Sequence, residues 1–287
     1  MSRIAYVNGR YVPHAKAAVH IEDRGYQFAD GVYEVCEVMD GVLIDETRHL
    51  ARLARSLSEL RIRPPMPDSA LKVVLRETVR RNRVRDGIVY LQVTRGVSRR
   101  DHYFPPESVA PSIVVTARSA DRAKANKAAE AGVAVITLPE NRWPRVDIKS
   151  VALLPNVLAK QQAKDAGAKE AWYVDADGYV TEGGSTNAWI VTGEGVIVTR
   201  SAESGILRGV TRTTLFDMAR DLQMRIEERA FTVEEASAAS EAFISAATAL
   251  VTPVISIDGR PVGDGAPGPV ASGLRRRFHE FAERAAP

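Results

Sequence analysis

The stretch Ile4-Ala5-Tyr6-Val7-Asn8-Gly9-Arg10-Tyr11-Val12 opens the chain with two short β-prone runs joined by a two-residue turn. Asn-Gly is the strongest short signal for a hairpin, because both residues tolerate the positive φ that so tight a turn requires. Asp40-Gly41 stands in the same way between the apolar runs 35–38 and 42–44. The N-terminal part is therefore predicted to contain an antiparallel sheet that is built from hairpins.

Helical patterns interrupt these hairpins. Leucines recur at helical spacing over 46–62, and the pattern stops at Pro64-Pro65. A second helix is predicted over 69–82, and strands are predicted over 88–94 and 112–116. Hairpins mixed with helices, without a regular alternation of strand and helix, favour an α+β fold.

The segment 119–131 is rich in Ala, Lys and Arg, and we expect it to connect two domains, 1–120 and 121–287. The second domain again has hairpin turns, at Asp177-Gly178, 193–195 and Asp258-Gly259. Its helices are predicted over 156–166, 211–222, 232–239 and 269–285.

Composition excludes several classes of protein. The 287 residues include 39 basic and 36 acidic ones, a net charge of only +3, which argues against a nucleic-acid partner. No apolar run approaches the roughly 20 residues that span a bilayer, and the first residues lack the apolar segment of a signal peptide. No membrane partner and a cytoplasmic location are therefore expected.

The numbers and spacing of cysteines and histidines argue against disulfide bonds and metal sites. The single cysteine, Cys36, cannot form an internal disulfide, and its apolar surroundings predict a buried strand residue. The five histidines show no paired spacing, so no metal site is predicted.

Lys149 is the first candidate for chemistry. It lies in Asp147-Ile148-Lys149-Ser150, directly before the apolar run 151–154. Lysine rarely enters apolar segments, and burial favours its neutral form, a nucleophile that can react with an aldehyde. The alternative is a surface lysine whose stem lies along apolar neighbours.

Glu182 is the second candidate, in Thr181-Glu182-Gly183-Gly184-Ser185-Thr186-Asn187. The two glycines would expose backbone N–H groups, and the hydroxyls of Ser185 and Thr186 could donate to an anion such as phosphate. The alternative is a polar hairpin turn.

Two further stretches suit anions. Val210 and Thr211 precede an amphipathic pattern, so their N–H groups would lie at a helix N-terminus, although Thr211 could simply cap that helix. Arg95, Arg100 and His102 follow a predicted strand and could clamp a carboxylate, unless they form only a solvated basic loop.

Together these motifs resemble the class IV (fold type IV) pyridoxal-5′-phosphate (PLP)-dependent aminotransferases. The segment 22–35, with Asp23-Arg24-Gly25 and Asp30-Gly31-Val32-Tyr33-Glu34, looks like the family's N-terminal motif. Five motifs occur in the family's order, from about Tyr6 to the C-terminal helix. The resemblance implies an N-terminal α/β sandwich, a C-terminal pseudo-barrel and a homodimer in which a partner loop borders the site.

The resemblance also implies roles for particular residues. Lys149 would hold PLP and act as the base, and Glu182 would pair with the pyridine nitrogen. Cofactor-binding residues would further include Arg52 (with Arg48 as competitor), Ser185, Thr186, Leu207, Val210, Thr211 and Ala247. Relatives commonly carry hydroxyl residues at the positions of Ala246 and Ala247, so one phosphate hydrogen bond is missing here, at a cost of about 0.5–1.5 kcal/mol.

Within the family the chain is most similar to the D-amino-acid transaminases, because Arg100 and His102 precede Tyr103-Phe104-Pro105. In that group the arginine, the histidine and a tyrosine matching Tyr33 bind the substrate carboxylate. The expected reaction transfers an amino group between a D-amino acid, such as D-alanine, and pyruvate or 2-oxoglutarate. Alternatives are a branched-chain L-amino-acid aminotransferase, an (R)-amine transaminase, aminodeoxychorismate lyase and a non-catalytic PLP-binding paralogue.

Overall fold

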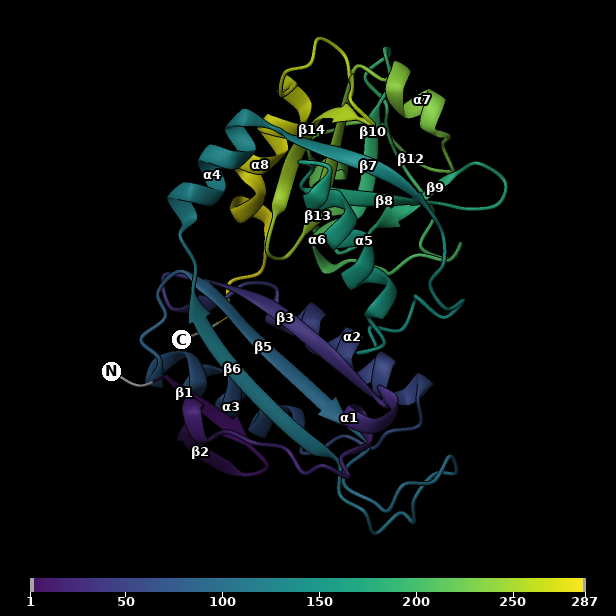
Figure 1. Ribbon diagram of the computed structural model, residues 1–287. Coiled ribbons are helices and arrows are strands. Elements are labelled where there is room, and N and C mark those ends of the chain that lie inside the picture. Colours follow the sequence, from purple (N-terminus) through teal and green to yellow (C-terminus); the bar gives the residue numbers. More distant parts are fainter. Residues whose placement is uncertain (1–2, 286–287) are drawn as a thin grey trace. The chain divides into compact units, whose positions relative to one another are not determined.

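The computed structural model describes residues 3–285, which form two compact units. Unit 1 comprises residues 3–122 together with Ile148–Ala152 and 283–285, and unit 2 comprises Ala123–Asp147 and Leu153–Ala282 (Figure 1). The two domains predicted from the sequence, 1–120 and 121–287, differ from this division in one important respect. Ile148–Ala152, which includes Lys149, packs with the N-terminal unit because Ile148 is buried in that unit's apolar core.

Unit 1 is built on a six-stranded antiparallel sheet in the order β2-β1-β6-β5-β3-β4 (Figure 1). Its strands are β1 (Ile4–Val7), β2 (Arg10–Pro13), β3 (Gly31–Met39), β4 (Val42–Leu43), β5 (Gly87–Thr94) and β6 (Ser112–Ser119). Both predicted hairpins are confirmed. Asn8 and Gly9 have φ values of 45° and 90°, and Asp40 and Gly41 have 55° and 83°, the left-handed region that their sequence predicted.

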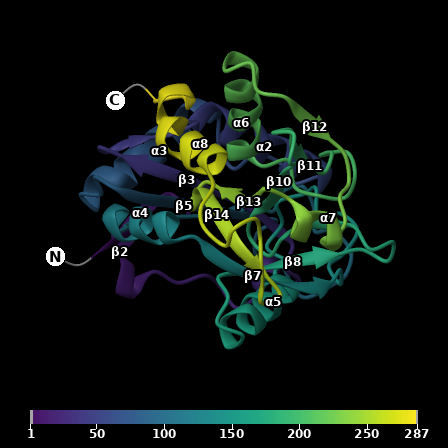
Figure 2. The same ribbon diagram turned by 90° about the horizontal axis from the view of Figure 1, so that it is seen from above.

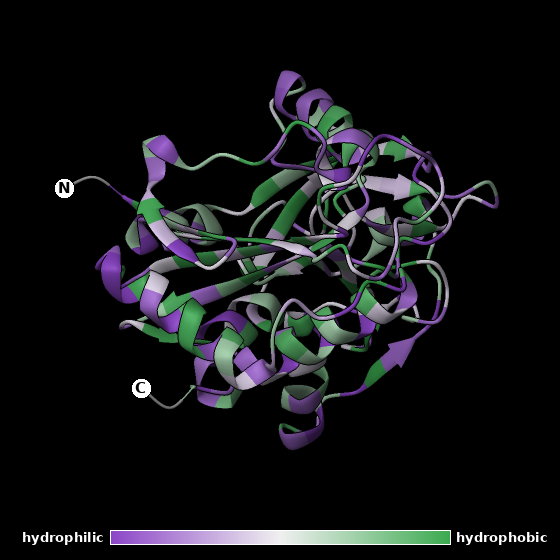
Figure 3. Ribbon diagram, turned by 90° about the horizontal axis from the view of Figure 1, so that it is seen from below, coloured by the Kyte–Doolittle hydropathy of each residue, from purple (hydrophilic) through white to green (hydrophobic). Residues whose placement is uncertain are grey.

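Two long helices, α2 (Glu46–Glu59) and α3 (Asp68–Arg81), pack against this sheet. Their leucine and valine faces join the inward residues of β3, β5 and β6 in one core. Figure 3 shows that hydrophobic (green) and hydrophilic (purple) residues occur together along the protein's helices. α2 ends before the predicted residue 62, because Arg61 has a left-handed φ of 53°. Two shorter elements are α1 (Arg24–Phe28) and a 3-10 turn, η1 (His14–Lys16).

The segment around Lys149 extends the sheet of unit 1 along one edge of β3. Tyr33 donates its N–H to the Lys149 carbonyl at 3.0 Å, and Val151 donates to the Gly31 carbonyl at 3.0 Å. A bridge between Val32 and Ser150 lies between these bonds. Lys149 is therefore held by backbone pairing, beside the strand that contains Tyr33.

Unit 2 contains a nine-stranded mixed sheet, whose main path is β12-β11-β10-β13-β14-β7-β8-β9, with β15 paired to β14. Its strands are β7 (Val133–Pro139), β8 (Glu170–Val174), β9 (Val180–Gly183), β10 (Asn187–Val191), β11 (Ile197–Thr199), β12 (Ile226–Glu228), β13 (Glu241–Ala246), β14 (Leu250–Ile257) and β15 (Arg260–Pro261). The last strand of the path, β9, packs against β10, so the sheet curls back on itself. This curling confirms the predicted pseudo-barrel.

Helices cover the curled sheet. They are α5 (Leu154–Asp165), α6 (Val210–Asp221), α7 (Val233–Ala238) and α8 (Pro269–Phe281), while α4 (Arg122–Ala131) occupies the predicted connection. α8 packs on β13 and β14 and against α6 (Figure 2). It ends four residues before the predicted position, because Glu283 and Ala285 pair instead with Asp45 and Leu43 of unit 1.

Among residues 3–285 we find no helix that is both long enough and apolar enough to cross a membrane.

Candidate active site

Glu182 is a buried carboxylate, 4% exposed, near the end of β9. It accepts hydrogen bonds from Arg142 Nη1 at 2.6 Å, Asn187 Nδ2 at 3.0 Å and the Leu207 N–H at 3.2 Å to each of its oxygens. Donors from three separate segments favour the ionised form and fix the direction of the carboxylate.

Arg142 connects Glu182 to a second carboxylate. Its guanidinium bonds Glu140 through Nε at 2.8 Å and Nη2 at 2.6 Å, and it stacks over the Tyr173 ring at 4.4 Å. Burial alone would lower the pKa of Arg142, but Glu140 and Glu182 outweigh it and raise that pKa. The arginine therefore stays charged and holds Glu182 in place.

The N-terminus of α6 lies close to this carboxylate. Its capping residue is Gly209, which offers no side chain to the helix, and Val210 and Thr211 are buried. A Cβ on Gly209 would fall 2.1 Å from Asn187 Oδ1, so a larger residue here would have to displace the Asn187 side chain. Asn187 also donates to Glu182 and to the Leu207 carbonyl, each at 3.0 Å. It thereby fixes Glu182 relative to a helix N-terminus that has no side-chain cap.

The structure excludes one of the two interpretations of Thr211, the one in which Thr211 caps the helix. Thr211 lies inside α6, at its second residue, so it is not the capping residue. A buried helix N-terminus without a side-chain cap is a site suited to an anion.

The glycine segment after Glu182 differs from the prediction. Gly183 donates its N–H to the Thr186 carbonyl at 2.7 Å, and Gly184 donates to the Ala171 carbonyl at 2.9 Å. The prediction that these N–H groups are exposed to an anion is therefore wrong. The backbone satisfies them because the turn between β9 and β10 closes on itself and on β8.

Ser185 and Thr186 both face a buried acid. Their hydroxyls donate to Glu170 Oε2, at 2.9 and 3.3 Å, and Glu170 is 1% exposed and paired with Lys160 Nζ at 3.0 Å. Each hydroxyl has one hydrogen, so an anion would compete for it with Glu170.

Ala247 lies in the turn that follows β13. The register Asn187↔Ser245 places this turn at the end of the barrel where β10 begins. Arg275 of α8 holds the turn by donating from Nη1 to the carbonyls of Ala249 and Val251, each at 2.7 Å. Arg275 therefore stabilises the conformation of this turn, although Ala246 and Ala247 have no side-chain hydroxyl to do so.

In unit 1, Lys149 is half-buried rather than fully buried. Its Nζ lies 4.3 Å from the centre of the Tyr33 ring, and Tyr33 stacks on Tyr90 with ring centres 5.8 Å apart. A cation over an aromatic face is attracted to it electrostatically, so this contact holds the end of the Lys149 side chain beside Tyr33. The structure thus brings together the predicted lysine and the predicted tyrosine.

Arg52 is engaged by a buried carboxylate that the sequence did not reveal. Arg52 binds Glu34 through Nε and Nη2, both at 2.8 Å, and His49 Nδ1 lies 2.7 Å from the same acid. Burial alone would lower the pKa of Arg52, but Glu34 outweighs it and raises that pKa. The pairing fixes the orientation of Arg52 rather than that of Arg48.

This cluster leads to a stability prediction. Burial alone would raise the pKa of Glu34, but Arg52 and then His49 hold that pKa well below its usual value. Glu34→Gln leaves a buried guanidinium without its counter-charge, and we expect a loss of about 3–5 kcal/mol at pH 7. Urea unfolding of both proteins measures this difference.

The pH dependence provides the control. A lowered pKa stabilises the folded state above the unfolded-state value, about 4.3, and this contribution disappears as pH falls through the folded-state pKa. The gap between wild type and Glu34→Gln should therefore narrow below about pH 4. A gap that is independent of pH would assign the loss to packing rather than charge.

Arg100 and His102 gather around Phe28 instead of Tyr33. The Arg100 guanidinium lies 4.4 Å from the centre of the Phe28 ring, and the ring centres of His102 and Phe28 are 5.5 Å apart. Their loop joins β5 to β6 and extends beyond the sheet of unit 1 (Figure 1).

Arg95, the third basic residue of this predicted clamp, has a different role. Arg95 is 9% exposed, binds both oxygens of Asp30 and donates to the carbonyls of Leu60 and Arg61. Its hydrogen bonds are taken up inside the protein, so the suggestion that it clamps a substrate carboxylate is wrong.

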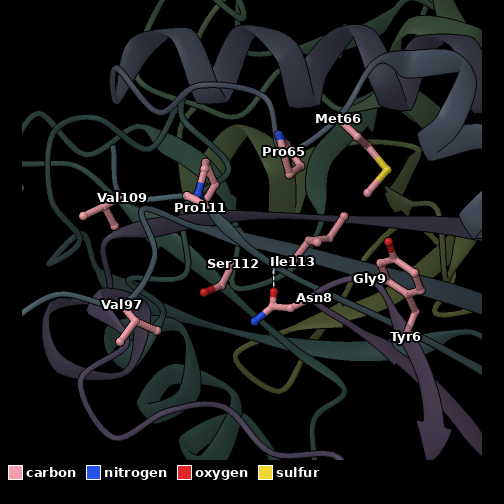
Figure 4. Close-up of a pocket in the computed structure, with 11 residues that line it drawn as sticks. Tyr6, Asn8, Gly9, Pro65, Met66, Val97, Val109, Pro111, Ser112 and Ile113 are labelled. Carbon is pink, nitrogen blue, oxygen red and sulfur yellow. Dashed lines mark hydrogen bonds between the residues drawn. The ribbon is translucent and has the colours of Figure 1, made fainter. Parts of the chain in front are cut away.

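A separate cavity of about 510 Å³ lies in unit 1 (Figure 4). Pro65, Met66 and Ile113 line it, together with Asn8, whose side chain accepts the Ile113 N–H at 2.7 Å. Its lining contains none of the predicted site residues and no acidic or basic side chain.

Sequence reasoning missed Arg142, Glu34 and Asn187. Arg142 is 40 positions from Glu182, and no periodic pattern connects them. Asn187 had a detectable signal, because it is the polar first residue of a strand that is otherwise fully apolar. A polar residue in such a place is usually held by specific hydrogen bonds.

These features define the class of protein. The sequence pattern of the family described as Amino-transferase class IV matches residues 31–257, and the chain belongs to this family. Relatives include a D-alanine aminotransferase of Bacillus licheniformis, 42% identical over 93% of each chain. Another is a D-alanine aminotransferase of Staphylococcus haemolyticus, 39% identical over 97% of each chain.

The fold agrees with that of solved members. A branched-chain amino acid aminotransferase (source organism T.th.), complexed with N-(5′-phosphopyridoxyl)-L-glutamate, superposes with a TM-score of 0.89. It is 28% identical, and the match covers 98% of this chain and 94% of that one.

Proposed function

We propose that this chain is a PLP-dependent aminotransferase that moves an amino group between a D-amino acid, such as D-alanine, and a 2-oxo acid, pyruvate or 2-oxoglutarate. The observation with most weight is the buried Glu182 carboxylate, fixed by Arg142 and Asn187 beside the uncapped N-terminus of α6. The identity of 42% with a D-alanine aminotransferase over nearly the whole chain supports the choice of substrate.

The donor set suits PLP, which has a basic ring nitrogen and a phosphate. Glu182 would accept from the protonated ring nitrogen, with Leu207 alongside, and Lys149 would bond to the aldehyde carbon. The phosphate would take the N–H groups of Val210, Thr211 and Ala247, Arg52, and the hydroxyls of Ser185 and Thr186. When bound, PLP supplies an electron sink for the substrate's Cα.

The protein's own part is proton transfer and orientation. Once the substrate's amino group has displaced it from the aldehyde carbon, Lys149 Nζ would be free to take the proton from the substrate's Cα as general base and to return it when the amino group is transferred. Glu182, kept ionised by Arg142, would place its negative charge near the protonated ring nitrogen and so favour electron flow away from Cα. The contact between Lys149 Nζ and the Tyr33 ring would hold the amine near the substrate's Cα.

Tyr33, Arg100 and His102 would fix the substrate's carboxylate, and this orientation decides which enantiomer presents its hydrogen to Lys149. In one chain Arg100 and His102 contact Phe28, while Tyr33 contacts Lys149. We therefore propose a homodimer in which the loop of one copy borders the site of the other. The strongly exposed Tyr103, at 83%, is an apolar group that such a contact would cover.

A substrate assay tests the function. We expect turnover of D-alanine with 2-oxoglutarate, and little with L-leucine. The matched enantiomers L-alanine and D-leucine separate stereochemistry from side-chain size. The fold similarity to a branched-chain aminotransferase favours L-leucine as the second candidate, and activity on L-leucine alone would establish that candidate instead.

A further inference from the structure

Unit 1 contains a buried cluster of two arginines around one aspartate. Asp30 Oδ2 accepts from Arg24 Nε at 2.8 Å and from Arg95 Nε at 2.7 Å, and its Oδ1 accepts from Arg95 Nη2 at 3.0 Å. The side chains of Arg24, Arg95 and Asp30 are 5%, 10% and 12% exposed. Charges buried to this degree need several partners each, and these three residues provide them for one another.

Both arginines also contact the loop that contains Arg100 and His102. Arg24 Nη1 donates to the carbonyl of Asp101, the residue between them, at 2.6 Å. The Arg95 guanidinium lies 3.7 Å from the centre of the Phe104 ring. The loop is therefore attached to the cluster at two points, on either side of His102.

Phe28 completes the arrangement. Arg24 lies over its ring at 4.8 Å and Arg100 at 4.4 Å, and His102 is a ring neighbour at 5.5 Å. Arg24 and Arg100 are both cations, and the Phe28 ring attracts each of them. Arg24 thus contacts both the backbone of the loop, at Asp101, and the Phe28 ring against which Arg100 and His102 pack.

Residues 98–111 form no helix or strand, and residues 99–104 are exposed, so neither core packing nor a ladder of hydrogen bonds orders Arg100 and His102. Their positions depend on the contacts just described. We propose that Arg24, Asp30 and Arg95 are positioning residues that set the geometry of the Arg100–His102 carboxylate clamp. This inference rests on the proposed function, in which that clamp binds the substrate's carboxylate.

The test is Arg24→Lys, which keeps the charge beside Asp30 but cannot also bond the Asp101 carbonyl. We expect KM for D-alanine and the dissociation constant of propionate, measured by calorimetry on the holoenzyme, to rise about tenfold, the loss of one charge-assisted hydrogen bond. The value of kcat and the affinity for PLP should change less than about twofold. A purely structural role would not produce this separation.

The matched control is Arg76→Lys, another arginine–carboxylate pair of unit 1, in which Arg76 binds Glu46 at 2.7 Å. Its loss should leave KM and propionate binding unchanged. If Arg24→Lys does not fold, Phe28→Leu removes the platform beneath Arg100 and His102 and is expected to weaken propionate binding similarly. Unchanged propionate binding in that variant would refute the inference.

Arg100→Ala, measured in parallel, separates this inference from the proposed function. If Arg100→Ala weakens propionate binding and Arg24→Lys does not, the clamp stands and the positioning role fails. If neither does, the clamp lies elsewhere and the inference fails with it. If only Arg24→Lys does, Arg24 acts by another route, and the inference is again refuted. Weakening by both variants, with PLP affinity intact, supports it.

Discussion

Lys149→Ala is expected to abolish transamination, with a loss of at least about 10⁴-fold in the rate of the half-reaction with D-alanine. The side-chain amine is proposed both to bond the cofactor and to move the Cα proton, and loss of a residue that acts as a general base or nucleophile has effects of this size or larger. Single-turnover measurements with each amino acid would record the rate, and absorbance would show whether cofactor still binds.

Lys72→Ala is the matched control, because Lys72 is another half-buried lysine of unit 1 and lies on α3. This variant should keep its full rate. A Lys149→Ala variant with a near-normal half-reaction would exclude Lys149 as the catalytic residue.

Glu182→Gln is expected to lower kcat by about 10²–10³-fold, the range found when one electrostatic contact to a transition state is removed. Glutamine has nearly the same shape and keeps one carbonyl oxygen for Asn187 and Leu207, but its amide nitrogen would face Arg142 Nη1, so the variant loses both the negative charge and one hydrogen bond. Titration with PLP and stopped-flow rates would separate weaker binding from slower chemistry.

Glu140→Gln is the control that separates the effect of the Glu182 charge on kcat from the effect of weaker support for Arg142. This change removes the other carboxylate of Arg142 and leaves the bond between Arg142 and Glu182. We expect lower stability, with kcat reduced by less than about tenfold. Equal losses of kcat in both variants would show that the arginine's support, rather than the charge of Glu182, limits the rate.

Much of the fold could be predicted because its signals are local. Asn8-Gly9 and Asp40-Gly41 specify tight turns through their own backbone preferences, and the leucines of α2 report one buried face. Helix ends were less predictable. α8 ends where the chain turns to pair with Leu43, a residue more than 230 positions away, and no local pattern records that pairing.

The residues of the site likewise fall into those that the sequence reveals and those that only the structure reveals. Lys149 and Glu182 stand out in the sequence because each is a charged residue in an apolar or glycine-rich setting. The partners that control them do not: Arg142 and Glu34 look like ordinary charged residues until the fold buries them against Glu182 and Arg52.

The sequence alone determined the family, the hairpins and the two residues at the centre of the proposed chemistry, because motif order and turn preferences are properties of neighbouring residues. Only the tertiary structure decided that Lys149 pairs with β3 of unit 1, that Arg95 serves Asp30, and that Gly183 and Gly184 bond to backbone. These outcomes depend on burial, and burial forces each charge or N–H to find a partner that can be distant in sequence.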